Sequence, residues 1–187
     1  GLVSAAVVKV ERKLMDLTKA SADAAHEIQI MSMVTGQSAE SIQSFSYASE
    51  IIGVSSDRIS DSLKEITNKM QDALNGNEET ALAFTNLNVA ITDSYGNMRK
   101  AEDVFCDTID ALGHISNQTE RDAIAMDLMS ESARELNPLI SAGSDAMQNY
   151  AEEARDMGYV LDDAALSALN DVDNAYTRLQ TTQESIQ

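Results

Sequence analysis

Three side chains that could bind a metal recur at intervals of four residues, namely Cys106, Asp110 and His114. Thiolate, imidazole and carboxylate are the ligands that zinc takes, and the ion needs three or four of them at about 2.0–2.3 Å. On a helix this spacing places the three on one face, but successive turns lie about 5.4 Å apart. The first and last residues are therefore too far apart to share an ion, and Gly113 weakens the helix at His114. We expect no metal site here.

Pairs of adjacent carboxylates are the other chemically suggestive feature. Paired carboxylates do acid–base work when they face each other across a cleft, whereas neighbours on a helix point in different directions. We therefore expect these pairs to be solvated. They are Glu78–Glu79, Glu102–Asp103, Glu152–Glu153 and Asp162–Asp163.

Motifs for other sites are missing from the sequence. There is no Gly-x-Ser-x-Gly, phosphate-binding or dinucleotide-binding glycine pattern. The stretch from Asp93 to Asn97 does not match a calcium loop, because glycine falls at the fourth position and no glutamate stands at the twelfth. We predict that the chain has no catalytic, cofactor-binding or metal-binding residues, needs no cofactor and is not an enzyme.

Composition favours helices. The 187 residues have the size of one domain, with one proline and 4% aromatic residues, and alternation of β-branched residues is almost absent. The formal net charge of −18 disfavours binding to nucleic acid or to anionic membranes. The single Cys106 excludes an intramolecular disulfide, and no apolar run is long enough to span a bilayer.

The chain is organised around a short sequence motif, here called a phrase, that occurs twice between Val34 and Ile66. Gly36-x-Ser38 followed by Ile42 recurs as Gly53-x-Ser55 followed by Ile59. Glycine can end a helix in the left-handed conformation, and a serine two residues later can cap the next helix. An acidic residue follows each serine by two positions, where it suits the positive end of the helix dipole. We predict a helix end and a helix start at both places.

Both ends of the chain have heptad spacing, in which apolar residues alternate steps of four and three. The seam near the N-terminus comprises Val3, Val7, Val10, Leu14, Leu17, Ser21, Ala24, Ile28 and Met31. The seam near the C-terminus comprises Leu161, Ala165, Ala168, Val172, Ala175, Leu179 and Thr182.

These patterns predict an all-α fold. Helices at 1–33 and 159–187 pair as an antiparallel coiled-coil stalk around a compact multi-helix head at 34–158. Each heptad helix could instead pair with another copy, or with parts outside a chain that starts at glycine and is expected to be a fragment. Within the head we predict helices at 38–52, 55–74, 78–87, 100–113, 119–135 and 141–157. At 89–98 we predict a small hairpin or an irregular loop around an Asp93–Asn97 turn.

Predicted helix boundaries rest on caps and breakers. Asn77 should cap the helix that follows it, and Thr119 to Asp122 resemble a capping box. The Asn137-Pro138 dipeptide should end the preceding helix after Leu136, and Gly143 should mark the next turn.

Ordered phrases in the head resemble the tape measure protein family of long-tailed bacteriophages and prophages, especially those of Gram-positive bacteria. They span about 34 to 158. The phrases are Val34-Thr-Gly-Gln-Ser38 with Ile42, Tyr47-Ala-Ser-Glu50, Ala83-Phe-Thr-Asn-Leu87 with Val89, Asp93-x-x-Gly96-Asn-Met-Arg99, Val104-Phe105, Ile109-Asp-Ala-Leu-Gly113, Ile115, Thr119-Glu-Arg-Asp122, and Ser132-Ala-Arg-Glu-Leu-Asn-Pro-Leu-Ile140 with Gly143.

The sequence departs from the family at two places. The family usually has glycine where Asn88 stands, and Phe-Gly where Met129-Ser130 stand. Either change alters local packing or turn geometry.

The resemblance implies a non-enzymatic structural segment of a tail protein that sets the length of the tail tube and takes part in DNA ejection. Its implied partners are the major tail protein of the tube, tail assembly chaperones and baseplate proteins. Its implied locations are the lumen of the virion tail and, during assembly, the host cytoplasm. We expect no contact of this segment with nucleic acid or membrane, and allow self-association through the heptad helices.

Two other functions remain open from the sequence. One is a helical interaction module, an adaptor or stalk of a bacterial protein that binds a partner helix. The other is an enzyme such as a cell-wall hydrolase, for which the residues supply no catalytic constellation.

Overall fold

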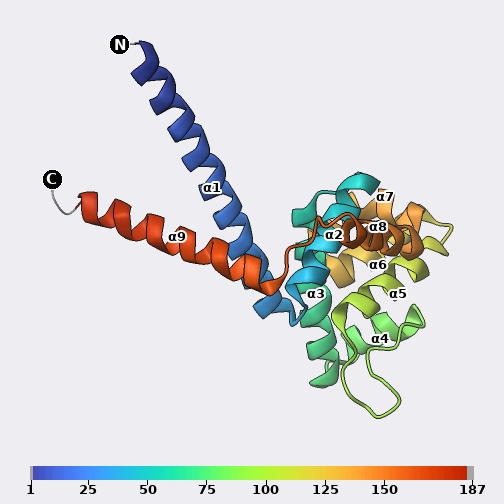
Figure 1. Cartoon of the computed structure of the whole chain (residues 1–187). Coiled ribbons are helices and arrows are strands. Elements are labelled where there is room, and N and C mark those ends of the chain that lie inside the picture. The colour runs from blue at the N-terminus through green and yellow to red at the C-terminus, as the bar shows by residue number, and fades with distance from the viewer. Residues whose placement is uncertain (1, 185–187) are drawn as a thin grey trace. The chain divides into compact units, whose positions relative to one another are not determined.

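The structure is a computed structural model that describes residues 2–184, and these form an all-helical fold (Figure 1). The expected fold class is confirmed at this level. Side chains before residue 19, and several after residue 172, lie outside the described part. The predicted seam residues from Val3 to Leu17, and Leu179, therefore lie outside the described side chains.

Contacts between Cα atoms divide the chain into two units. The central unit runs from Met31 to Val160, and the flanking unit combines the residues up to Ile30 with those from Leu161 onwards. Helix α1 (Leu2–Thr35) contributes to both units, whereas α9 (Asp163–Glu184) belongs to the flanking unit.

The flanking unit buries few of its described side chains. Ala22 and Ala25 of α1 are buried, and each follows a predicted seam residue by one position. In α9 Leu166 is fully buried, one position after the seam residue Ala165, whereas Val172 is 42% exposed. At these places the buried face therefore lies one residue beyond the predicted seam.

The central unit is a bundle of helices. It contains α2 (Ala39–Ile52), α3 (Ser56–Leu74), α4 (Glu78–Asn86), α5 (Ala101–Gly113), α6 (Gln118–Met129), the 3₁₀ helix η1 (Ser130–Leu136), α7 (Asn137–Ala142) and α8 (Ser144–Asp156). Helix α3 packs against α2, α4, α5, α6 and η1, and α2 packs closely against α8. Helix α3 buries one apolar face, which is made up of Ile59, Leu63, Ile66 and Met70.

The repeated glycine–serine phrase ends and starts helices as predicted. Gly36 and Gly53 have φ angles of 70° and 95°, in the left-handed region that glycine tolerates. Ser38 caps α2, because its hydroxyl accepts a hydrogen bond from the backbone nitrogen of Ser41 at 3.1 Å. Ser55 stands at the start of α3 but makes no side-chain capping bond, so that part of the prediction is wrong.

The predicted helix at 119–135 is wrong in its second half. Helix α6 ends at Met129, and the chain continues as the 3₁₀ helix η1 before α7 begins at Asn137. The capping box predicted at Thr119 is also wrong. Asn117 caps α6 instead, because its side-chain oxygen accepts hydrogen bonds from the backbone nitrogens of Thr119 and Glu120.

The segment between α4 and α5 is an irregular loop, drawn as the long excursion in Figure 1. Its one antiparallel bridge in the described structure joins Thr92 and Met98. The predicted Asp93–Asn97 turn is present, and the Asp93 carboxylate accepts hydrogen bonds from the backbone of Tyr95 and Asn97. These bonds, led by the one from the Asn97 backbone, lower the pKa of Asp93 below its ordinary value of 3.8.

Candidate functional site

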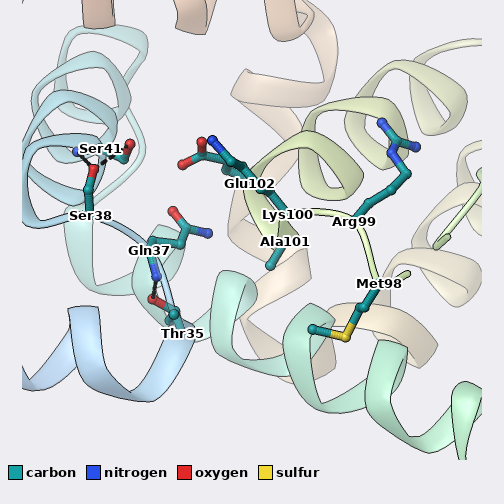
Figure 2. Close-up of a pocket in the computed structure, with 10 residues that line it drawn as sticks. Thr35, Gln37, Ser38, Ser41, Met98, Arg99, Lys100, Ala101 and Glu102 are labelled. Atoms are coloured by element: carbon teal, nitrogen blue, oxygen red, sulfur yellow. Dashed lines mark hydrogen bonds between the residues drawn. The ribbon is translucent and has the colours of Figure 1, made fainter. Parts of the chain in front are cut away.

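A pocket in the central unit lies where α1 ends and α5 begins (Figure 2). Its volume is about 360 Å³. One wall is the turn from Thr35 to Ser41, and the other is the stretch from Met98 to Glu102. The left-handed Gly36 ends α1 and the capping Ser38 starts α2, so these two residues shape the first wall.

A buried amide joins the two walls. Gln37 is 7% exposed, and Figure 2 shows its side chain pointing toward Glu102. When the amide oxygen and nitrogen of Gln37 are exchanged relative to Figure 2, which gives both atoms a partner, the nitrogen donates to Oε2 of Glu102 at 3.1 Å and the oxygen accepts from the backbone nitrogen of Glu102 at 3.2 Å. The amide thus binds the free backbone end of α5, and its polar atoms are used within the fold.

The second wall is held by an arginine. Arg99 donates from Nη1 to the backbone oxygen of Ala90 at 2.7 Å and to Oδ2 of Asp107 at 2.8 Å. These bonds connect the two sides of the loop between α4 and α5, at Ala90 and at Arg99, and attach them to Asp107 of α5. The guanidinium therefore neutralises a carboxylate of the fold, which leaves it poorly suited to bind an anionic substrate.

The hollow does not contain a nucleophile activated by a base. Its hydroxyl groups include Ser38 and Ser41, which hydrogen-bond to each other at 3.0 Å. Neither histidine nor cysteine lines it. General-base activation of a serine requires an acceptor such as imidazole within hydrogen-bond reach, whereas the Ser38 hydroxyl bonds to Ser41 through its hydroxyl and its backbone nitrogen.

Cys106 borders a second hollow of about 280 Å³ between α5 and α8. Burial raises the pKa of its thiol from the ordinary value of 9.0 to about 12, and neighbouring carboxylates add to this, while a hydrogen bond from Gln148 opposes it. The thiol therefore stays protonated at neutral pH, as is typical of a buried and unreactive cysteine.

In the structure, Asp110 and His114 of the rejected metal constellation use their side chains for hydrogen bonds within the fold. The Asp110 carboxylate accepts hydrogen bonds from the backbone nitrogen and hydroxyl of Ser144 at 2.8 and 2.6 Å. The exposed His114 bonds through Nδ1 to the backbone oxygen of Asp110 at 2.7 Å. Across the described part of the chain, no group of three histidine, cysteine, aspartate or glutamate residues could hold a metal ion.

The carboxylate pairs face solvent. Seven of their eight members are exposed, and Glu102 is half-buried. The structural role of Asp110 was missed from the sequence, because its partner Ser144 lies 34 residues away. A local signal was nevertheless present, since Gly143 precedes α8 and has no side chain to cap it.

Two wider observations bear on function. Within the described residues, no helix is both long and apolar enough to cross a bilayer. Comparison with protein-family models, with curated proteins and with solved structures gives no significant match to this chain.

Proposed function

We propose that this chain is a non-enzymatic structural segment of a phage tail tape measure protein. In this role it sets the length of the tail tube together with the rest of that protein and leaves the tube ahead of the DNA. The proposal rests on the ordered phrases between about 34 and 158, which fall within the central unit of Met31–Val160.

One observation carries the proposal. Among residues 2–184, the non-glycine residues with a positive φ are Asn88 and Ser130, each at 57°. These are the two positions at which the family usually has glycine. Glycine enters the positive-φ region freely, whereas other residues rarely do. At both places where the sequence departs from the family, the backbone therefore has a conformation that favours glycine.

The hydrogen bonds around Asn88 support the same argument. Its backbone nitrogen donates to Thr85 at 2.9 Å, and the nitrogen of Val89 donates to Phe84 at 3.0 Å. This is the pattern of a Schellman motif, whose left-handed residue is usually glycine and sometimes asparagine. Val89 and Phe84 are both buried in the hydrophobic core, which is the environment of the apolar pair that accompanies the motif.

Phrases far apart in the resemblance also meet in the fold. Asp110, from one phrase, binds Ser144, which directly follows the Gly143 of another. A Cβ added to Gly113 would lie 3.2 Å from the backbone oxygen of Ile140, so a side chain there would crowd α7. The phrases thus place small and polar residues where helices come close together.

The surface charge fits a protein that must release DNA. The whole chain has a formal net charge of −18. Affinity for the phosphate backbone comes mainly from lysine and arginine, so an acidic segment in the tail lumen would not retain DNA as it leaves.

We further propose that α1 and α9 pair as an antiparallel coiled-coil stalk around the central unit. The heptad spacing at both ends of the chain is the basis for this pairing, although the buried Ala22, Ala25 and Leu166 lie one position beyond the predicted seam. Proposed partners of the whole protein are the major tail protein, the tail assembly chaperones and the baseplate proteins.

The proposal is tested by asking where the protein is found. Mass spectrometry of purified phage particles from the source strain should detect peptides of the central unit. The genes that flank its reading frame should encode tail tube and baseplate proteins. A chain that is absent from particles and encoded among unrelated genes would be a bacterial interaction module instead.

A further inference from the structure

The chain between α6 and α7 holds an unusual backbone conformation at Ser130. Its φ of 57° and ψ of −157° fall in a region that is essentially reserved for glycine. The chain does not return to an α-helix directly after this position, because the seven residues Ser130–Leu136 form the 3₁₀ helix η1. Runs of this helix longer than three or four residues are uncommon, because their hydrogen-bond geometry is poorer. The break is thus locally unfavourable on both counts.

The same residues fit a single α-helix. The buried positions on either side of the break recur at the steps of three and four that define one helical face. They are Ala125, Leu128, Met129, Ser132, Ala133 and Leu136. Alanine, leucine, methionine, glutamate and arginine, which dominate this stretch, are also strong helix formers. An unbroken helix over 118–136 would therefore present the same apolar face to the core.

Contacts from other elements hold the broken form. The hydroxyl of Ser132 lies 2.9 Å from that of Ser62 on α3, in a buried pair, and also donates to the backbone oxygen of Met129. Arg58 of α3 forms an ion pair with Glu135 at 3.1 Å. These tertiary contacts oppose the local preference of the segment.

We propose that Gln118–Leu136 is a two-state element. In one state it is broken at Ser130, and in the other it is a continuous α-helix. An α-helix rises about 1.5 Å per residue and a 3₁₀ helix about 2.0 Å, so the switch shortens η1 by about 3.5 Å. Helix α7 follows directly, and its Leu139 and Ile140 are buried in the core. A change of backbone conformation at Ser130 would therefore displace α7 and the junction between α7 and α8.

The switch is tested by NMR exchange measurements on the full chain. In the wild type, the ¹³Cα signals of residues 129–133 should exchange with a minor state that has α-helical chemical shifts. Minor states of this kind are populated at about 0.1–10%. Ser130→Gly removes the strain of the broken form and should abolish the exchange. Ser130→Ala keeps the Cβ that strains the broken form and is the better helix former, so it should increase the minor population by about twofold.

Ala123→Gly, at an exposed position within α6, is the matched control and should leave the exchange as it is in the wild type. A wild-type chain without exchange at residues 129–133 would overturn the proposal. Exchange that persists unchanged in Ser130→Gly would do the same. If Ser130→Ala does not fold, the spectra of the wild type and of Ser130→Gly decide the question without it.

Discussion

Asp110 of α5 caps a helix that begins 34 residues later, because both of its carboxylate oxygens accept hydrogen bonds from Ser144. The backbone nitrogen of Ser144 is 2.8 Å from Oδ1, and its hydroxyl is 2.6 Å from Oδ2. The first turn of a helix leaves free N–H groups that normally bind a side chain just before it. Gly143 cannot supply one, so the acceptor comes from a neighbouring helix and fixes α8 to α5.

Replacing Asp110 should therefore destabilise the central unit. Asp110→Ala removes two hydrogen bonds to a charged acceptor and leaves the buried Ser144 unpaired, which should lower the free energy of unfolding by about 2–3 kcal/mol. Asp110→Asn keeps one acceptor and should lose about half as much. Urea unfolding followed by circular dichroism measures both. The exposed Glu153→Gln on α8 is the control, and a loss equal to that of Asp110→Ala would contradict the capping role.

Ser130→Gly should stabilise the protein. Glycine takes the backbone conformation of residue 130 without strain, and we expect a gain of about 1 kcal/mol in the free energy of unfolding. The same substitution at the exposed Ser141, inside α7, should instead cost about 0.5–1 kcal/mol, because glycine weakens a regular helix. Thermal and urea unfolding of the two variants should thus shift in opposite directions. Equal shifts would mean that Ser130 is not strained.

Asn88 should tolerate glycine but not alanine. At positive φ a Cβ without a compensating polar group is unfavourable, so Asn88→Ala should lower the free energy of unfolding by about 1 kcal/mol. Asn88→Gly should be neutral or slightly stabilising. Asn86→Ala, at the last residue of α4, should be neutral or stabilising because alanine is the better helix former. If Asn88→Ala and Asn86→Ala behaved alike in urea unfolding, the Schellman assignment would be wrong.

Local signals predicted much of the fold. Gly36, Gly53 and Gly143 ended helices because glycine alone takes positive φ freely. Ser38 and Asn77 capped the helices that follow them, since the acceptor and the donor lie within three residues of each other. Such interactions depend on a few neighbouring residues, so the sequence determines them.

Other features depend on parts of the chain that are far apart. The helix break at Ser130 was not predicted, because residues 119–135 by themselves favour a single helix, and the contacts of η1 with α3 involve residues that are distant in the sequence. The hydrogen bonds between Gln37 and Glu102 link the two walls of the pocket. The two residues are far apart in the sequence, so no local pattern predicts these bonds. At the candidate site, helical spacing argued against convergence of Cys106, Asp110 and His114 on one ion. It could not predict that Asp110 would bind Ser144.

Cys106 should be unreactive in the folded protein. Because burial raises the pKa of its thiol to about 12, a maleimide or disulfide reagent at pH 8 should label it only after unfolding. The unfolded thiol ionises near 9.0, so its contribution to stability is constant below that pH and falls as the pH rises from 9 to about 12. Cys106→Ser should lack this alkaline loss in urea unfolding at pH 8 to 10.5. Rapid labelling of the folded chain would contradict the assigned burial.

The proposed stalk should unfold separately from the central unit. Leu14 and Leu17 occupy successive positions of the N-terminal heptad seam, and replacing both with aspartate places charges where a coiled coil needs apolar residues. Circular dichroism should show a loss of helix confined to the flanking unit, because the central core lies within Met31–Val160 and contains none of these residues. Ala20→Asp, at an exposed position of α1, should leave the helix content unchanged. Cooperative unfolding of the whole chain by the double substitution would show instead that stalk and central unit are one folding unit.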